Sequence, residues 1–274
     1  MTKAIILAVL VLFSGPAYAA PDHPKAPGVP EVTITTADYS FTAPQEIPAG
    51  LVSLTIDNVG KEPHHAQMAR LNEGVTPADF QAALQKGLVE ADALVSWVGG
   101  PSLVDPGTKS TVTLRLEAGT HLLLCFVPDM QGVPHLAHGM VGAIQVVPGE
   151  SQAAAPTADL TVNLVDFAFA FSEGIPAGTQ TWEVVNDGEQ IHEIALMKLA
   201  EGKTIEDVEH FMHEMQGPPP FANVGGMQAI DPGSSGWLHL DLTPGTYVAI
   251  CHVPDLATGE THASMGMVMP FVVQ

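Results

Sequence analysis

The sequence predicts a mainly β protein, built as a pair of antiparallel β-sandwiches that each carry a short helical insertion. Three observations lead to this prediction. Hydrophobic residues make up 46% of the 274 residues and charged residues only 14%, which is typical of a well-packed chain and not of a disordered one. Gly and Pro are abundant, at 26 and 23 residues, and they separate short β-rich segments. Finally, the second half of the chain repeats the first, and the length suits two domains.

The first residues have the pattern of a secretory signal peptide, which we expect to cover 1–19. Lys3 precedes an apolar run from Ala4 to Phe13, and a small-x-small site follows at Ala17-Tyr18-Ala19. The apolar run is too short to span a bilayer. We therefore expect an exported protein, periplasmic or extracellular, without membrane insertion.

The internal repeat defines the expected domains. At an offset of 128 residues, Asn58-Val59-Gly60 and the following His64 align with Asn186-Asp187-Gly188 and His192. After a two-residue length difference, Cys125 aligns with Cys251, and both halves continue Val-Pro-Asp. A match of this extent indicates tandem duplication of one domain. We expect domains at 31–148 and 159–274, joined by an Ala/Pro/Ser/Gly-rich linker at 149–158.

Within each repeat, most elements are expected to be strands. In order, β-rich or alternating segments occupy 32–35, 51–56, 111–116, 120–127 and 140–147, and then 160–165, 181–185, 237–242, 246–253 and 268–273. A helix interrupts each repeat. Thr76 is suited to the N-cap, with Pro77 in the first turn and Asp79 three residues on, and Thr204 and Asp207 are the counterparts.

Each repeat also contains one His, one Cys, a second His and a Met in the same order. The two sets are His64, Cys125, His135, Met140 and His192, Cys251, His262, Met267. Two imidazoles and a thiolate with a weak axial thioether form the ligand set of a blue copper site. Two imidazoles and one thiolate also bind zinc. Copper is favoured because a nearby Met adds little for zinc, so we expect up to two mononuclear copper sites.

This pattern resembles a tandem cupredoxin, the fold family of plastocyanin and azurin. The resemblance covers about 115 residues of each repeat and implies a Greek-key sandwich with copper at one end, used for single-electron transfer. One feature departs from the family, which commonly places two to four residues between the Cys and the second His. Here nine residues separate Cys125 from His135, and ten separate Cys251 from His262. His138 is an alternative to His135, although its counterpart in the second repeat is Met265.

Other interpretations remain open at this point. A disulfide between Cys125 and Cys251 requires Cα atoms within about 7 Å, and two buried free thiols would behave as small hydrophobes. For function, the 11 methionines favour copper storage, delivery or resistance as an alternative to electron transfer. A metal-free binding module is the third possibility, suggested by the long loop between Cys and His.

The charge balance restricts the partners. Nine basic residues face 30 acidic ones, for a net charge of -21, or about -22 once Lys3 is removed with the signal peptide. Nucleic acid is excluded as a partner by this charge. A basic redox protein, such as a small exported cytochrome, would be attracted.

Familiar catalytic motifs are missing from the sequence. It contains no Gly-x-Ser-x-Gly, no phosphate-binding glycine loop, no Cys-x-x-Cys, no His-Glu-x-x-His and no His-x-His. On this basis we expect the chain not to be an enzyme.

Overall fold

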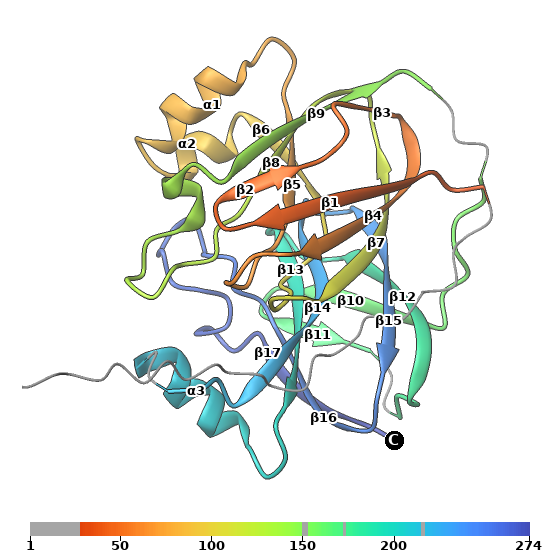
Figure 1. Ribbon diagram of the computed structural model, residues 1–274, viewed down its shortest axis with the longest axis vertical. Helices are drawn as coiled ribbons and strands as arrows, with labels where there is room; N and C mark the ends of the chain where they lie inside the picture. The colour runs from red at the N-terminus through yellow and green to blue at the C-terminus, as the bar shows by residue number, and fades with distance from the viewer. Residues whose placement is uncertain (1–27, 150–152, 172–173, 215–216) are drawn as a thin grey trace, which may run out of the picture.

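The computed structural model describes residues 28–149, 153–171, 174–214 and 217–274 (Figure 1). The predicted signal peptide at 1–19 lies outside these residues, as does part of the predicted linker. Within the described ranges, no helix is both long and apolar enough to cross a membrane.

Two large sheets contain almost all the strands. The first has eight strands in the order β11-β10-β12-β15-β7-β4-β1-β2. They are β1 (Glu31–Ala37), β2 (Ser40–Thr42), β4 (Gly50–Asn58), β7 (Lys109–Leu116), β10 (Leu160–Val165), β11 (Ala168–Ala170), β12 (Gly178–Asn186) and β15 (Ser235–Leu242).

The second sheet has nine strands in the order β17-β16-β13-β14-β6-β5-β8-β9-β3. They are β3 (Glu46–Pro48), β5 (Gln67–Leu71), β6 (Val95–Gly99), β8 (Gly119–Leu124), β9 (Val141–Val147), β13 (His192–Leu199), β14 (Phe221–Ile230), β16 (Gly245–Ile250) and β17 (Val268–Val273).

The two repeats share both sheets. Equivalent strands meet at each join: β15 pairs antiparallel with β7, with Leu238 opposite Val112, and β14 pairs antiparallel with β6, with Ile230 opposite Val98. Antiparallel pairing of equivalent strands relates the repeats by an approximate two-fold axis. The sequence predicted two sandwiches, but it gave no sign that their sheets are continuous.

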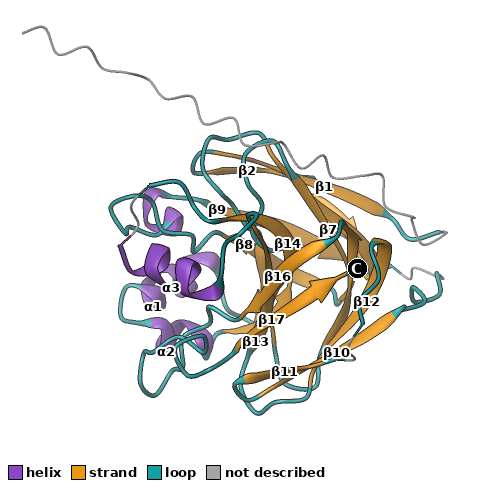
Figure 2. Ribbon diagram, turned by 90° about the horizontal axis from the view of Figure 1, so that it is seen from below, coloured by secondary structure: helices purple, strands orange, loops and turns teal. Residues whose placement is uncertain are grey.

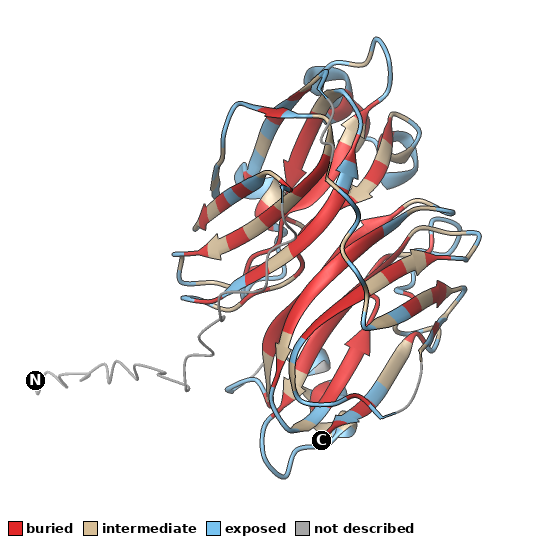
Figure 3. Cartoon of the chain, turned by 90° about the vertical axis from the view of Figure 1, so that its right-hand side faces the viewer, coloured by how far each residue is buried: buried red, intermediate tan, exposed pale blue. Residues whose placement is uncertain are grey.

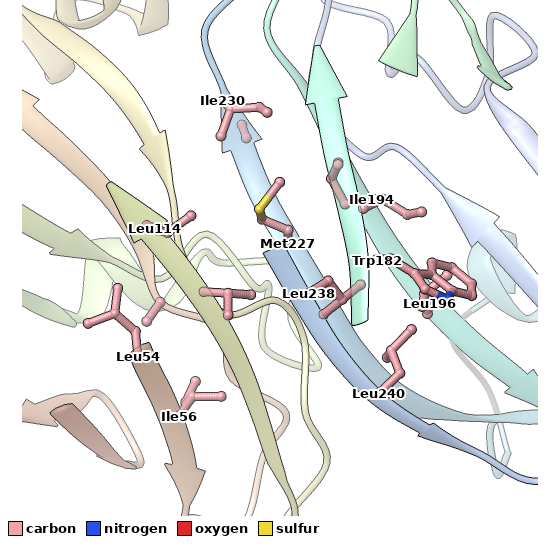
Figure 4. Packing of buried hydrophobic residues seen from close by; sticks show 14 of the residues in the cluster. Leu54, Ile56, Leu114, Trp182, Ile194, Leu196, Met227, Ile230, Leu238 and Leu240 are labelled. Carbon is pink, nitrogen blue, oxygen red and sulfur yellow. The ribbon is translucent and has the colours of Figure 1, made fainter. Parts of the chain in front are cut away.

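A buried apolar layer fills the space between the sheets. It runs through both repeats, from Leu54 and Leu114 in the first to Met227, Leu238 and Trp182 in the second (Figure 4). Figure 3 shows the same pattern along the chain, with buried residues concentrated on strands and exposed residues in loops. Because this layer crosses the join, burial of apolar surface holds the repeats together.

The helices lie on the same side of the molecule over the second sheet (Figure 2). They are α1 (Pro77–Leu84), α2 (Leu88–Asp92) and α3 (Ile205–Glu214), with a 3-10 helix, η1, at His135–His138. Helices α1 and α2 lie toward one end of the long axis and α3 toward the other (Figure 1). Phe80 of α1 packs on Leu122 and Leu124, and Val208 of α3 packs on Val248 and Ile250. The predicted capping box is present at Thr76 and Asp79, and the Thr204 N–H donates to Asp207.

All ten predicted strand segments form strands, although the two that contain the cysteines end earlier than expected. The segment predicted at 120–127 ends at Leu124 and the one at 246–253 ends at Ile250, so each Cys directly follows its strand. The three-residue strands β2, β3 and β11 were not predicted, and neither were β5, β6, β13 and β14. The last four precede or follow the helical insertions, and β6 and β14 form the centre of the second sheet.

Candidate metal centre

The structure brings each set of two His and one Cys together. In the first repeat, Cys125 Sγ lies 3.5 Å from His135 Nδ1 and 3.9 Å from His64 Nδ1, and the two Nδ1 atoms are 3.1 Å apart. All three side chains are fully buried. These three donor atoms form one of two such groups in the described part of the chain.

The second repeat has the same arrangement. Cys251 Sγ lies 3.5 Å from His262 Nδ1, and that nitrogen is 3.0 Å from His192 Nδ1. The three residues are again fully buried, and their donor atoms lie within 4.8 Å of one another. Two sites with the same donors and closely similar distances thus arise from repeats whose surrounding residues differ.

The outer nitrogens of the rings show that the Nδ1 atoms are acceptors. His192 Nε2 lies 2.8 Å from Asp166 Oδ1, and His262 Nε2 lies 3.2 Å from Gln190 Oε1. Because these oxygens accept hydrogen bonds, each Nε2 carries the ring hydrogen and each Nδ1 presents its lone pair. Two lone pairs 3.0 Å apart beside a sulfur repel one another unless a cation lies between them. The donors therefore fit a metal ion that takes nitrogen and sulfur ligands.

In the first repeat, a carboxylate lies near the Nε2 atom of each of the two imidazole rings. His135 Nε2 lies 2.8 Å from Glu62 Oε2, and His64 Nε2 lies 3.5 Å from Asp38 Oδ1. Asp38 aligns with Asp166 at the repeat offset, whereas Glu62 aligns with the neutral Gln190. The two sites thus have the same donors but differ by one negative charge in the surrounding shell.

An Asn-x-Gly turn fixes the first His of each site. The Asn58 side chain accepts from the Gly60 N–H at 2.9 Å and donates to Glu62 O at 2.8 Å, and Asn186 makes the equivalent bonds. Glycine is required at Gly60 because an added Cβ would lie 2.6 Å from Asp38 Oδ1 and 2.9 Å from His64 Nε2. The turn thereby allows the ring and its carboxylate to approach the backbone.

The long segment between Cys and the second His forms a loop whose two ends are held together by backbone contacts. Pro128 bridges to Pro134, the His135 N–H donates to Val127 O, and the Leu136 N–H donates to Cys125 O. Asp129 closes the turn by accepting from the Gln131 and Val133 N–H groups, and Asp255 has the corresponding role in the second repeat. Because the chain returns to where it left, the extra residues do not move the second His away from the Cys.

His138, the alternative to His135, faces a different group. Its Nε2 lies 2.8 Å from Asp129 Oδ2, and its ring stacks on Tyr39 with centroids 4.5 Å apart. Tyr39 also meets His135 edge-on at 5.0 Å, and Phe167 contacts His262 in the same way at 5.1 Å. The geometry thus places His135, not His138, beside Cys125.

The two cysteines are free and buried, so the alternative of a disulfide between them is not realised. Burial raises the pKa of the Cys125 thiol to about 11 and also raises the pKa of Cys251. Burial lowers the pKa of His64 and His262, which favours neutral imidazoles. At neutral pH the metal-free sites therefore hold thiols, and a bound metal would displace one proton from each.

Met140 and Met267 are fully buried next to the second His of each site. The Met140 N–H donates to His135 O at 3.0 Å, and the Met267 N–H donates to His262 O at 2.9 Å. Their role as axial ligands stays a prediction.

Sequence reasoning missed the outer groups Asp38 and Asp166 and the ring contacts of Tyr39 and Phe167. Tyr39 and Phe167 have positive φ angles of 64° and 61°, so each occupies the same unusual turn. Extending the repeat alignment toward the N-terminus would have found both pairs, since each pair is separated by 128 residues.

The chain is similar to solved structures of several copper proteins. No protein-family model and no curated protein matches the sequence. An auracyanin from Roseiflexus castenholzii is 22% identical over 43% of this chain and 97% of its own, with a TM-score of 0.31. A multicopper oxidase is 17% identical over 89% of this chain and 88% of its own, and a copper nitrite reductase from Nitrosomonas europaea is 17% identical over 89% and 93%, each with a TM-score of 0.26.

The fold is cupredoxin-like. This statement rests on the two-sheet topology and on the His, Cys and His cluster at the end of each sandwich, since similarity at these identities concerns the fold alone. The prediction that the chain is not an enzyme is contradicted, because the structures similar to most of the chain include a multicopper oxidase and nitrite reductases, which are enzymes. The absence of familiar motifs was an insufficient reason to exclude catalysis.

We predict that Gly60→Ala weakens metal binding at the first site. The added methyl group must displace the His64 ring or Asp38, and changes next to metal ligands typically reduce affinity about 10- to 100-fold. Gly142→Ala is the control, because its Cβ would meet its nearest neighbours at 3.4 Å. Cu(I) affinity should be measured by competition with a chelator in a Cys251→Ser background. Equal affinities for the two variants would contradict the role given to Gly60.

We also predict that the outer charge sets a difference in reduction potential between the sites. Glu62→Gln should raise the copper potential of the first site, because a negative charge that favours the oxidised state is removed. Gln190→Glu should lower that of the second site. Each shift should be on the order of 50 mV. Redox titration of chains with one intact site measures the effect, and shifts of the same sign for both substitutions would contradict this explanation.

Proposed function

We propose that this chain is an exported copper protein that transfers single electrons through two mononuclear sites. His64, Cys125 and His135 hold one copper ion and His192, Cys251 and His262 the other, with Met140 and Met267 as axial ligands. The observation that carries the proposal is the pair of buried Nδ1, Nδ1 and Sγ clusters, in which the three donor atoms lie close enough to bind one metal ion.

The donor set supports copper as the metal. Thiolate and thioether sulfur favour Cu(I), and imidazole accommodates Cu(II), so copper held here supplies a one-electron couple. The protein's own contribution is to fix the rings. Outward hydrogen bonds from Nε2 to Glu62, Asp166 and Gln190 hold the imidazoles in place before metal binds. Ligands that are already oriented need to move little when the charge of the metal changes.

Burial of the ligands favours electron transfer over copper delivery. The four His and two Cys side chains are fully buried, and aromatic rings of Tyr39 and Phe167 contact the second His of each site. A protein that hands copper to a partner needs an accessible ligand, whereas an electron can cross a closed site. Export follows from the predicted signal peptide and is part of this proposal.

We predict two copper ions per chain, bound independently. Cys125→Ser and Cys251→Ser should each remove one copper ion and half of the intense thiolate-to-Cu(II) absorption. The double variant should bind no copper at either His, Cys and His cluster. Metal analysis and visible spectra of the four proteins measure this. His138→Ala is the control and should keep both ions. Loss of both ions in one single variant would show that the sites are not separate, and a colourless protein with tightly bound Cu(I) would favour copper handling.

We further propose that the partner is a basic redox protein. With a net charge of about -22, the mature chain would attract a basic partner by long-range electrostatics. The electron-transfer rate with a basic cytochrome should fall about tenfold or more as ionic strength rises from about 0.01 to 0.1 M, because the Debye length shortens from about 30 to 10 Å. Stopped-flow kinetics with a basic and an acidic partner of matched potential test this. Rates independent of salt and of partner charge would contradict it.

A further inference from the structure

A cavity of about 420 Å³ lies between the two repeats, apart from both metal clusters. It is situated over the join of β6 and β14, with Leu88 of α2 on one side and Met212 of α3 on the other. Three exposed apolar side chains, Leu88, Met212 and Leu256, line it where it meets solvent. Apolar side chains left exposed around a cavity are typical of a ligand site.

The residues next to the metal ligands form the polar part of this cavity. His65 follows His64, and its Nε2 accepts the N–H of Phe126, the residue after Cys125, at 2.8 Å. Glu193 follows His192, and its Oε1 accepts the N–H of His252, the residue after Cys251, at 2.9 Å. All four residues line the cavity. The repeat symmetry thus places two diverged pairs, His65 with Phe126 and Glu193 with His252, around one space.

Polar atoms in this space lack partners within the described part of the chain. His65 is 9% exposed, and because its Nε2 is an acceptor, the ring hydrogen is on Nδ1, for which no partner is present. Both ring nitrogens of His252 are also without a hydrogen bond. In the described part of the chain, neither residue has a ring nitrogen that is both fully buried and without a partner, so these nitrogens are accessible from the cavity and can form hydrogen bonds with a ligand.

The remaining walls define the kind of ligand. The rings of Trp97 and Phe126 lie with centroids 6.3 Å apart and present an aromatic surface. Asp92 and Glu193 are among the described lining residues, which include no Lys or Arg, so an anion would be unfavourable. A cavity of about 150 Å³ holds a benzene molecule. The present volume is therefore suited to two or three rings.

We propose that the cavity binds a neutral bicyclic aromatic molecule that carries a hydroxyl group. The rings pack against Trp97 and Phe126. The hydroxyl oxygen accepts from His65 Nδ1–H and its hydrogen is donated toward His252 or Glu193, because a hydroxyl both donates and accepts. The site does not depend on copper, so it can be tested in the metal-free protein, separately from the proposed electron transfer.

The test uses 2-naphthol as the probe and naphthalene as the analogue without a hydroxyl. Equilibrium dialysis against the metal-free full chain should show one bound 2-naphthol per chain, and naphthalene bound about three- to tenfold more weakly, the effect of one or two hydrogen bonds. Equal affinity for the two compounds, or no binding of 2-naphthol, would overturn the proposal.

Two substitutions locate the site. Leu103→Trp places a larger side chain at a half-buried lining position and should reduce 2-naphthol affinity at least tenfold, whereas Val272→Trp, on the exposed side of β17, should leave it unchanged. His65→Phe removes the donor to the hydroxyl oxygen, so it should lower 2-naphthol affinity toward that of naphthalene and leave naphthalene binding unaltered. Circular dichroism confirms that each variant is folded. Unchanged 2-naphthol binding in Leu103→Trp, or equal loss in both Trp variants, would assign the ligand to another place.

Discussion

The structure depends on the convergence of two imidazole lone pairs on a cysteine sulfur, twice in one chain. The Nε2 atoms of His135, His192 and His262 point outward to Glu62, Asp166 and Gln190, and in each site the two Nδ1 atoms point inward at 3.0 to 3.1 Å from each other. That arrangement is electrostatically unfavourable without a cation. The surrounding fold must hold it, and a bound metal would relieve it.

Several otherwise separate features serve this geometry. The Asn-x-Gly turn lets the first ring approach the backbone, because at Gly60 and Gly188 a side chain would collide with the ring or its carboxylate. The loop after each Cys is closed by the Asp129 or Asp255 turn, so the second His returns to the strand end. The residues after His64 and Cys125 are then free to differ between repeats, and they face the shared cavity rather than the metal cluster.

The fold class and the ligand residues could be predicted from one sequence because its two repeats can be aligned with each other. The repeat offset separated His135, which has a counterpart in His262, from His138, which has none. It could not reveal how the repeats pack, because the joins at β7 with β15 and at β6 with β14 depend on tertiary contacts between strands. Strands β5, β13 and β14 were missed for a related reason: most of their residues are buried, so they lack the alternation that marks a half-exposed strand. Asp38 and Asp166 were missed because an isolated Asp in the sequence does not indicate that its carboxylate will contact the imidazole of a distant His in the fold.

The central claim is that each cluster binds copper through two imidazole nitrogens and one thiolate. X-ray absorption spectroscopy of the copper-loaded chain and of its Cys251→Ser variant tests this most directly. The account predicts one short copper–sulfur contact and two histidine nitrogens per copper, with the same first shell retained at the single remaining site. A first shell of oxygen and nitrogen without a short sulfur contact would contradict it.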